Sequence, residues 1–143
     1  MTSRDIKINF IIETVANYYS MVTDDLMIKT RRTEYIKPRY ISIYFSKKIT
    51  QTSYENLATY YPVYTVTSCH AKIRHAYNSI QGRIDIYKSF QNEMDEVSKY
   101  IKDQWKKRSD EIKKDAEIKR MEQEESDMDK EVFTFQLNDF YKN

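Results

Sequence analysis

Residues 53–82 read SYENLATYYPVYTVTSCHAKIRHAYNSIQG, and this stretch decides the fold. Ser53 predicts the start of a helix, because its hydroxyl oxygen accepts a hydrogen bond from a free N–H of the first turn. The short helix covers residues 54–61, and Pro62 ends it because proline lacks the N–H that a further turn would use. The residues expected to point inward from this helix are Leu57 and Ala58.

A connector of β-branched character, residues 63–67, leads into a longer helix that begins at Ser68 and ends near Gly82. A strand is an alternative for the connector only. Apolar positions in the longer helix recur with a 3.6-residue period, namely Ala71 or Cys69, Ile73, Ala76, Tyr77 and Ile80. Lys72, Arg74 and His75 fall largely off that stripe. Short helices, a tight link and a helix with a small, polar, basic beginning make a helix-turn-helix pattern.

Three further helices are predicted upstream. The first covers about residues 5–20, where apolar residues recur at helical spacing. Thr23-Asp24-Asp25 supplies a capping oxygen and negative charge for a second, short helix. Lys37-Pro38 opens a third, because proline at the first helical position gives up only a donor that would be unpaired. This helix is expected to place Ile41, Tyr44, Phe45 and Ile49 on one face, and Arg39, Lys47 and Lys48 elsewhere.

From about Tyr87 the chain predicts a long helix in two parts. The first carries a core-facing stripe of Phe90, Met94, Val97 and Ile101. Beyond Trp105 the helix is polar nearly all round, so we expect it to project, to fray or to pair with a partner, with a coiled coil as one alternative. The expected organisation is a helix-turn-helix domain in residues 1–101, a charged helical extension in residues 102–130, and an apolar tail in residues 131–143.

The tail reads EVFTFQLNDFYKN and is expected to be a strand or helix that docks, or a short binding peptide. Its segment Gln136 to Phe140 is similar to the Q-L-x-L-F peptide that bacterial proteins insert into the replication sliding clamp. Asp139 stands where that peptide needs an apolar residue, so a docking segment for the body or for a second subunit is the preferred interpretation.

The overall composition narrows the function classes. With one glycine and two prolines, the chain has no glycine-rich loop of the kind that cradles nucleotide phosphates, and helices are favoured. The single cysteine excludes an internal disulfide framework. The sequence has neither an apolar run long enough to span a membrane nor a secretory signal, so we expect a cytoplasmic protein that does not bind membranes.

Positive charge gathers in one region although the net charge is only +2. From Lys29 to Lys48 there are seven Lys or Arg residues and one acid, Glu34. A local basic patch of this size is typical of a surface that contacts a polyanion. The alternative interpretation is a solvated charged face.

The chain's only cysteine and both its histidines, Cys69, His70 and His75, lie within seven positions. A metal or nucleophile site is disfavoured, because His70 and His75 are about 500° apart around a helix and adjacent residues point about 100° apart. Cys69 is therefore interpreted as a small packing residue. The thirteen tyrosines could stack on single-stranded bases, but most fall at or beside core positions, so packing is preferred for those. Tyr35 and Tyr64 are the exposed candidates that could touch sugar or bases.

Several ordered motifs resemble the C-terminal DNA-binding domain of the bacterial replication initiator DnaA. They are VANYY at residues 15–19, Asp25-Leu26, the basic loop of residues 29–32, KPR at residues 37–39, KKIT at residues 47–50, Ser53, HAKIRHAYNSI at residues 70–80, and IDIYKSFQNEMDEV at residues 84–97. The match covers roughly residues 6–101. The resemblance implies an all-α, Trp-repressor-like or DnaA-like helix-turn-helix domain that binds double-stranded DNA, with no enzymatic activity and no cofactor.

The resemblance also implies which residues contact DNA. Arg31 matches an arginine that enters the minor groove, where it senses groove width and negative potential. His70 matches a base-contacting histidine at the start of the major-groove helix. The full predicted set is Arg31, Arg32, Lys37, Arg39, Lys47, Lys48, Ser68, His70, Ala71, Lys72 and Arg74, of which Lys37, Arg39, Lys47 and Lys48 are expected to hold phosphates.

The chain also departs from the family pattern. The family usually has Gly-Gly-Arg-Asp-His before the major-groove helix, whereas residues 62–70 read PVYTVTSCH and lack the Arg-Asp pair. In an alternative register His70-Ala71 matches the family's second His-Ala, but the first register is preferred because it also aligns Ile73 and Ile80. We therefore expect the chain not to read the initiator's own DNA box, and, without the ATPase module, not to melt an origin by itself.

Two functions follow from these features. The first is a stand-alone DNA-binding protein in replication or transcription control of a bacterium or its phage, located in the cytoplasm. The second is an interaction or structural protein that kept the fold and binds a protein partner, or itself, through residues 102–143. The basic loop favours the first function, whereas the missing Arg-Asp pair and the near-neutral net charge favour the second.

Overall fold

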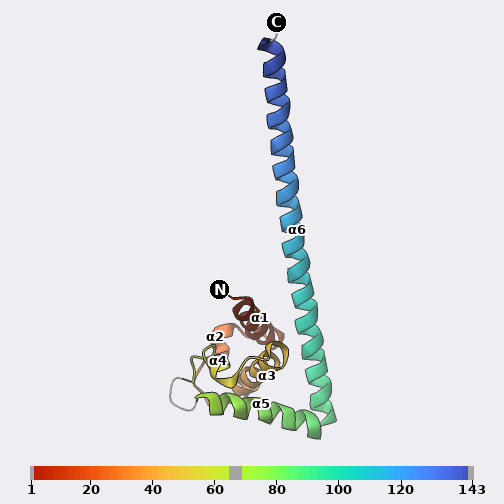
Figure 1. Cartoon of the computed structure of the whole chain (residues 1–143). Helices are drawn as coiled ribbons and strands as arrows, with labels where there is room; N and C mark the ends of the chain where they lie inside the picture. The colour runs from red at the N-terminus through yellow and green to blue at the C-terminus, as the bar shows by residue number, and fades with distance from the viewer. Residues whose placement is uncertain (1, 65–68, 142–143) are drawn as a thin grey trace. The chain divides into compact units, whose positions relative to one another are not determined.

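The computed structural model describes the backbone of residues 2–64 and 69–141, and the side chains within these ranges as far as residue 125. All the regular secondary structure within these ranges is helical, with turns and loops between the helices, which confirms the all-α prediction (Figure 1). The helices are α1 (Ser3–Tyr18), α2 (Thr23–Leu26), α3 (Thr33–Thr50), α4 (Tyr54–Ala58), α5 (Cys69–Ile86) and α6 (Lys88–Tyr141). The chain divides into two compact units, Met1–Gln104 and Trp105–Asn143, so α6 contributes to both.

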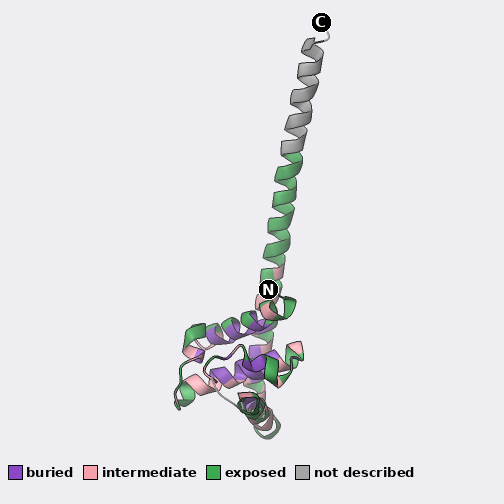
Figure 2. Ribbon diagram, turned by 60° about the vertical axis from the view of Figure 1, so that its left-hand side comes forward, coloured by how far each residue is buried: buried purple, intermediate pink, exposed green. Residues whose placement is uncertain are grey.

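In the first unit, α3 packs against both α1 and α5, and the core forms among them (Figure 2). The predicted apolar stripes supply this core, because their side chains avoid water when they face one another. The fully buried residues of the central cluster include Ile8, Ala16, Leu26, Ile43, Leu57, Ile73 and Ala76. Cys69 packs against the same cluster and Ala71 is exposed, so Cys69 takes the core-facing position that the sequence left open between them.

The first two helices begin with caps made by carboxylates. Thr2 and Asp5 form a reciprocal capping box at the start of α1, and the Tyr60 hydroxyl also donates to Asp5. These hydrogen bonds, led by the one from Tyr60, lower the pKa of Asp5 to about 2. At α2 the Asp25 carboxylate accepts from the Val22 N–H at 3.0 Å. Thr23 is therefore the first helical residue there and not the capping residue that the sequence predicted.

Helix α3 begins at Thr33, four residues before the predicted start at Lys37-Pro38. The N–H groups of Tyr35 and Ile36 already bond to the Arg32 carbonyl, at 3.1 and 3.0 Å. Pro38 therefore lies inside the helix, where near the N-terminus it costs one backbone bond without ending the helix. On the face predicted to carry Ile41, Tyr44, Phe45 and Ile49, the first three are buried, whereas Ile49 is 48% exposed and lines an open groove.

The helix-turn-helix link is tied to α3 by a buried tyrosine. Helix α4 ends at Ala58, earlier than predicted, and the N–H groups of residues 59–61 continue as turns bonded three residues back. The Ser42 hydroxyl donates to the Arg39 carbonyl at 2.7 Å, so Tyr61, 2.9 Å from the Ser42 Oγ, is the donor of that second bond. Burial raises the pKa of Tyr61. Tyr61, just after α4, therefore has a fixed position on α3.

Helix α5 runs past Gly82 to Ile86, further than predicted. A single glycine costs a helix only about 1 kcal/mol relative to alanine, which the packing of Ile73, Ala76 and Ile80 outweighs. The following helix, α6, begins at Lys88, as the change of pattern near Tyr87 predicts. Its residues Phe90, Met94, Val97 and Ile101 are buried, which confirms the predicted stripe.

The second unit consists of the distal part of α6. Residues 110–125 are exposed, including Ile112, Ile118 and Met121 at 60%, 45% and 56%. The backbone stays helical as far as Tyr141, so the strand alternative for the tail is wrong. The proposed clamp peptide concerns side chains that lie outside the described residues. Nowhere in the described parts of the chain is a helix both long and apolar enough to cross a membrane.

Candidate nucleic-acid interface

The basic loop of residues 29–32 connects α2 to α3 and presents its cations to solvent. Lys29, Arg31 and Arg32 are all exposed. Arg32 has an ion pair with Glu34 at 3.6 Å, but both side chains are more than two-thirds exposed, so water screens the attraction. The Arg32 N–H donates to the Thr30 hydroxyl at 3.2 Å, which shapes the turn into α3. The loop therefore offers cationic side chains that a polyanion could reach.

Arg39, predicted to hold a phosphate, lies beneath this loop with only 4% of its surface exposed. Its Nε donates to the Leu26 carbonyl at 2.6 Å, and its Nη2 donates to the Ile28 carbonyl. These carbonyls belong to the last residue of α2 and to the residue just before the basic loop, where helical partners are missing. Arg39 therefore positions the loop from behind and is not available to DNA.

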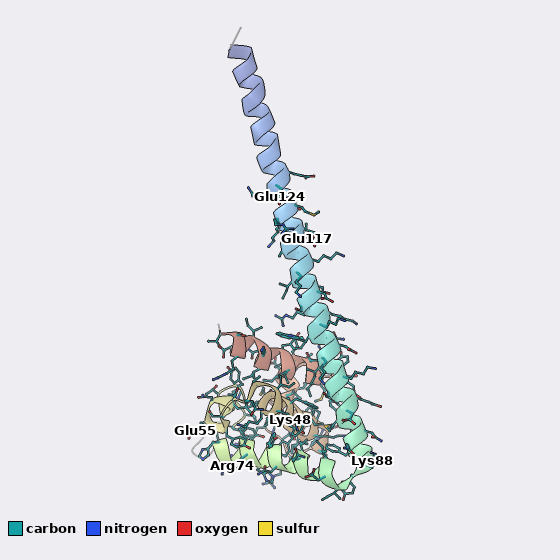
Figure 3. All side chains as sticks on the ribbon, turned by 45° about the vertical axis from the view of Figure 1, so that its right-hand side comes forward. Lys48, Glu55, Arg74, Lys88, Glu117 and Glu124 are labelled. Atoms are coloured by element: carbon teal, nitrogen blue, oxygen red, sulfur yellow. The ribbon has the colours of Figure 1, made fainter. Side chains whose placement is uncertain are left out.

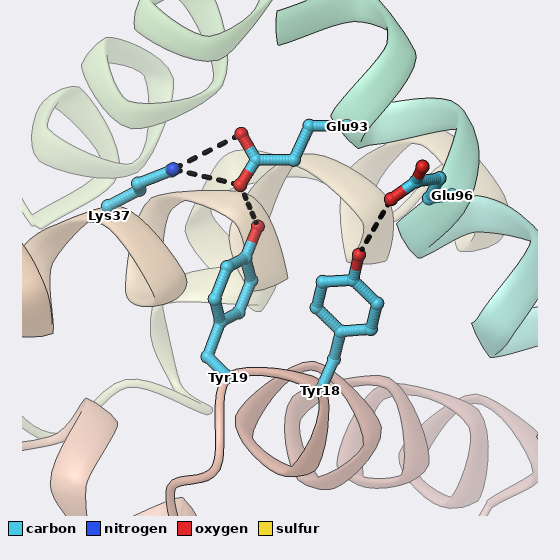
Figure 4. Close-up of polar contacts among 5 residues, drawn as sticks. All are labelled: Tyr18, Tyr19, Lys37, Glu93 and Glu96. Carbon is cyan, nitrogen blue, oxygen red and sulfur yellow. Dashed lines mark hydrogen bonds and ion pairs between the residues drawn. The ribbon is translucent and has the colours of Figure 1, made fainter.

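Lys37, also predicted to hold a phosphate, is engaged by the first part of α6 (Figure 4). Its Nζ lies 2.8 and 3.1 Å from the two Glu93 carboxylate oxygens, and the Tyr19 hydroxyl donates to the same carboxylate at 3.0 Å. Beside it, the Tyr18 hydroxyl donates to Glu96 at 3.2 Å. Burial, followed by the Glu93 charge, raises the pKa of Tyr19. The charge of Lys37 is thus neutralised inside the unit.

The first turns of α5 present the predicted major-groove residues. His70, Ala71, Lys72 and Arg74 are exposed there, while Ser68 lies outside the described residues. His75, which the sequence did not select, is also exposed and meets the Tyr40 ring edge-on at 6.1 Å between centroids. Within the described ranges, His, Cys, Asp and Glu side chains form no group of three or more that could hold a metal ion.

A hollow of about 450 Å³ brings the basic loop and α5 together. Lys29 and Thr30 line it from the loop, and Ala71, Lys72 and His75 line it from α5. The floor is made by Arg39, Tyr40, Val63 and Tyr64. Tyr64 was among the tyrosines that the sequence offered for contact with nucleic acid. Lys29, Tyr40 and His75 are interface candidates outside the predicted set, because their proximity depends on how α3 packs against α5. The signals for Lys29 were its place in the basic patch and its place in the basic loop of the family resemblance.

The remaining predicted phosphate contacts come from the end of α3. Lys47 donates to the Thr52 carbonyl at 2.7 Å, and its Nζ lies 4.6 Å from the centre of the Tyr54 ring. Lys48 is exposed and lines a separate groove of about 390 Å³ with residues of α5 and α6. Figure 3 shows Arg74 towards one end of α5 and Lys88 at the start of α6, on opposite sides of the first unit. Lys48, at the end of α3, thus lines a different hollow from the one lined by Lys29 and Lys72.

Residues 8–80 match the family model described as the bacterial DnaA protein helix-turn-helix. This chain belongs to that family. The matched span runs from α1 to the middle of α5 and so includes the basic loop, the hollow and the link before α5. The DnaA helix-turn-helix domain is a non-catalytic DNA-binding domain. The match therefore confirms the family and the fold class that the resemblance of motifs predicted.

Chromosomal replication initiator proteins DnaA are among the similar proteins. The one from Bacteroides thetaiotaomicron is 24% identical over 100 residues, which cover 70% of this chain and 20% of that protein. The one from Flavobacterium psychrophilum is 24% identical over 98 residues, with 68% and 20% covered. The one from Caldanaerobacter subterraneus subsp. tengcongensis is 26% identical over 100 residues, with 70% and 21% covered. The matched part of the chain thus spans about a fifth of each of these DnaA relatives.

Proposed function

We propose that this chain binds double-stranded DNA through the hollow and the two elements at its sides. The observation that carries the proposal is the hollow itself, because it is lined by Lys29 from the basic loop and by Lys72 from α5. The DNA backbone between a minor and a major groove is a continuous line of negative charge, and a concave cationic surface attracts it. Membership in the DnaA helix-turn-helix family supports the same function.

The proposed contacts use most of the predicted residues. Arg31 and Arg32 extend from the basic loop, with Arg31 in the minor groove. The first turns of α5 face the major groove through His70, Ala71, Lys72 and Arg74, together with Ser68 outside the described residues. Lys47 and Lys48 hold phosphates from the end of α3. Arg39 and Lys37 are left out, since one is buried and the other is paired with Glu93.

The biological setting is proposed from the relatives and from the sequence. The similar proteins are chromosomal replication initiators, which favours a role in replication or in transcription control, in a bacterium or its phage. The segment before α5 lacks the family's Arg-Asp pair, so we propose a DNA target different from the initiator's own box. Contacts with the bases carry the sequence information, so a change in the residues that contact bases changes the DNA sequence that is bound.

Selection of bound duplexes from a random pool tests the proposal. We expect the full chain to enrich a defined sequence, with an affinity that falls steeply as salt rises because phosphate contacts release counterions. A minor-groove contact by Arg31 predicts A·T enrichment at one side of the site. If random and genomic duplexes show no mobility shift even at low salt, the DNA-binding proposal fails.

A second candidate function is a protein contact through residues 102–143. The exposed Ile112, Ile118 and Met121 favour it, because apolar side chains on an otherwise charged helix gain from a partner. If this contact is with a second copy of the chain, we expect sedimentation equilibrium of the full chain to show a dimer. We expect the double variant Ile118→Glu with Met121→Glu to be monomeric. The control Lys113→Gln with Lys119→Gln, which lowers the net charge by the same amount, should leave the dimer. A wild-type chain that stays monomeric rules out this contact with a second copy.

A further inference from the structure

Three tyrosine rings from three helices form a row beside the end of α3. Tyr44 of α3 stacks on Tyr77 of α5, with centroids 5.1 Å apart and planes 25° from parallel. Tyr54, the first residue of α4, meets Tyr77 at 6.3 Å with planes 62° apart. Stacked and edge-on contacts at these distances hold aromatic rings in fixed positions. The row therefore gives a rigid apolar surface that joins α3, α4 and α5.

Two cations from different helices lie over the Tyr54 ring. The Lys47 Nζ, from the end of α3, is 4.6 Å from the ring centre. The Arg74 Cζ, from α5, is 5.3 Å from it. Both distances are within the range where the negative face of an aromatic ring attracts a cation. One side chain therefore connects a proposed phosphate contact to a proposed major-groove contact.

The contact with a ring differs from the contact that holds Lys37. Glu93 neutralises Lys37, whereas a tyrosine ring carries no net charge and leaves the charge of its cations intact. Lys47 donates one hydrogen bond to the Thr52 carbonyl, and a lysine ammonium has three donors, so donors remain for a phosphate. The ring therefore orders these cations without cancelling their attraction for DNA.

We propose that Tyr54 is a positioning residue that sets Lys47 and Arg74 for contact with duplex DNA. This inference rests on the proposed DNA-binding function. Lysine and arginine lose much rotamer freedom when they bind a phosphate, and ordering them beforehand lowers that cost. Tyr54 also fixes the distance between the phosphate contact on α3 and the first turns of α5. The Ser53 Oγ caps α4 by accepting a hydrogen bond from the Asn56 N–H at 3.2 Å. This cap fixes the start of the helix, where Tyr54 is the first residue.

The test compares Tyr54→Leu with Tyr54→Phe in the full chain. Duplex affinity is measured by fluorescence anisotropy, under conditions where urea unfolding shows each variant to be folded. Since each cation–ring contact at an exposed site is worth a few-fold in binding, we expect Tyr54→Leu to weaken binding about tenfold. Tyr54→Phe keeps the ring and should bind within about twofold of the wild type. If Tyr54→Leu does not fold, Tyr54→Met takes its place.

A double-mutant cycle separates positioning from packing. Once Lys47→Met and Arg74→Met have removed both cations, Tyr54→Leu should weaken binding no further, because the ring has nothing left to position. The positioning role is wrong if the leucine and phenylalanine variants bind equally well, or if the leucine change has its full effect in the absence of both cations. A wild-type chain that does not bind duplexes overturns the DNA-binding function itself, and that result is visible before any variant is compared.

Discussion

Arg39→Met should lower the free energy of unfolding by about 3 kcal/mol, because a buried carbonyl left without a donor costs about 1 to 3 kcal/mol and a second, partly buried carbonyl adds to that cost. The two carbonyls concerned are those of Leu26 and Ile28, which Arg39 reaches from α3. Methionine keeps the length and the apolar stem of arginine, so the change removes the donors and the charge while leaving most of the packing. Urea unfolding followed by circular dichroism measures the difference.

Arg39→Lys should have a free energy of unfolding between those of the wild type and Arg39→Met. Lysine keeps the charge that suits carbonyls at a helix C-terminus, but it lacks the planar fork that reaches two acceptors at once. The matched control is Arg32→Met, an arginine 75% exposed at its side chain, which should stay within about 0.5 kcal/mol of the wild type. If the urea-unfolding curve of Arg39→Met overlays that of the wild type, water satisfies these carbonyls and the loop does not depend on Arg39.

The behaviour of Arg39 marks a limit of sequence reasoning. Composition and motif show where charge is concentrated, but they do not show which charged side chain the fold encloses. Arg39 and Lys37 are two residues apart and both looked like phosphate contacts. Arg39 is a buried donor to the Leu26 carbonyl, which precedes it in the chain. Lys37 pairs with Glu93, 56 residues away. Both outcomes depend on packing between helices, which no local pattern contains.

The elements themselves were far more predictable than their partners. Periodicity is a property of neighbouring residues, so the spacing of apolar side chains is enough to predict α1, α3, α5 and the buried stripe of α6. Helix ends were less secure, because Pro38 and Gly82 each oppose a helix by an amount that tertiary packing overcomes. The tyrosines show the same difference between what local spacing predicts and what depends on packing between helices. Their core-side positions followed from spacing, but the cations above their rings come from other helices.

The double variant Lys29→Glu with Lys72→Glu should reduce duplex affinity on the order of 100-fold near 0.1 M salt, since each lost phosphate contact costs roughly tenfold and each new carboxylate repels. The two residues line the hollow from different elements, the basic loop and α5, and both are exposed. Each single variant should account for about half of the loss in free energy, because separated sites act additively. The slope of affinity against salt should fall by about two counterions, which anisotropy titrations at several salt concentrations measure.

Net charge has to be separated from position in this experiment. Lys88→Glu with Lys99→Glu makes the same change, from +2 to −2, on exposed residues of α6 outside the hollow. Figure 3 places Lys88 on the side of the first unit away from Arg74, so this variant alters the overall field but not the proposed contact surface. Repulsion over distances beyond about 8 Å is largely screened at physiological salt, so the control should lose only a few-fold in affinity. Equal losses in both pairs would mean that the chain attracts DNA by its overall charge and that the hollow is not the binding surface.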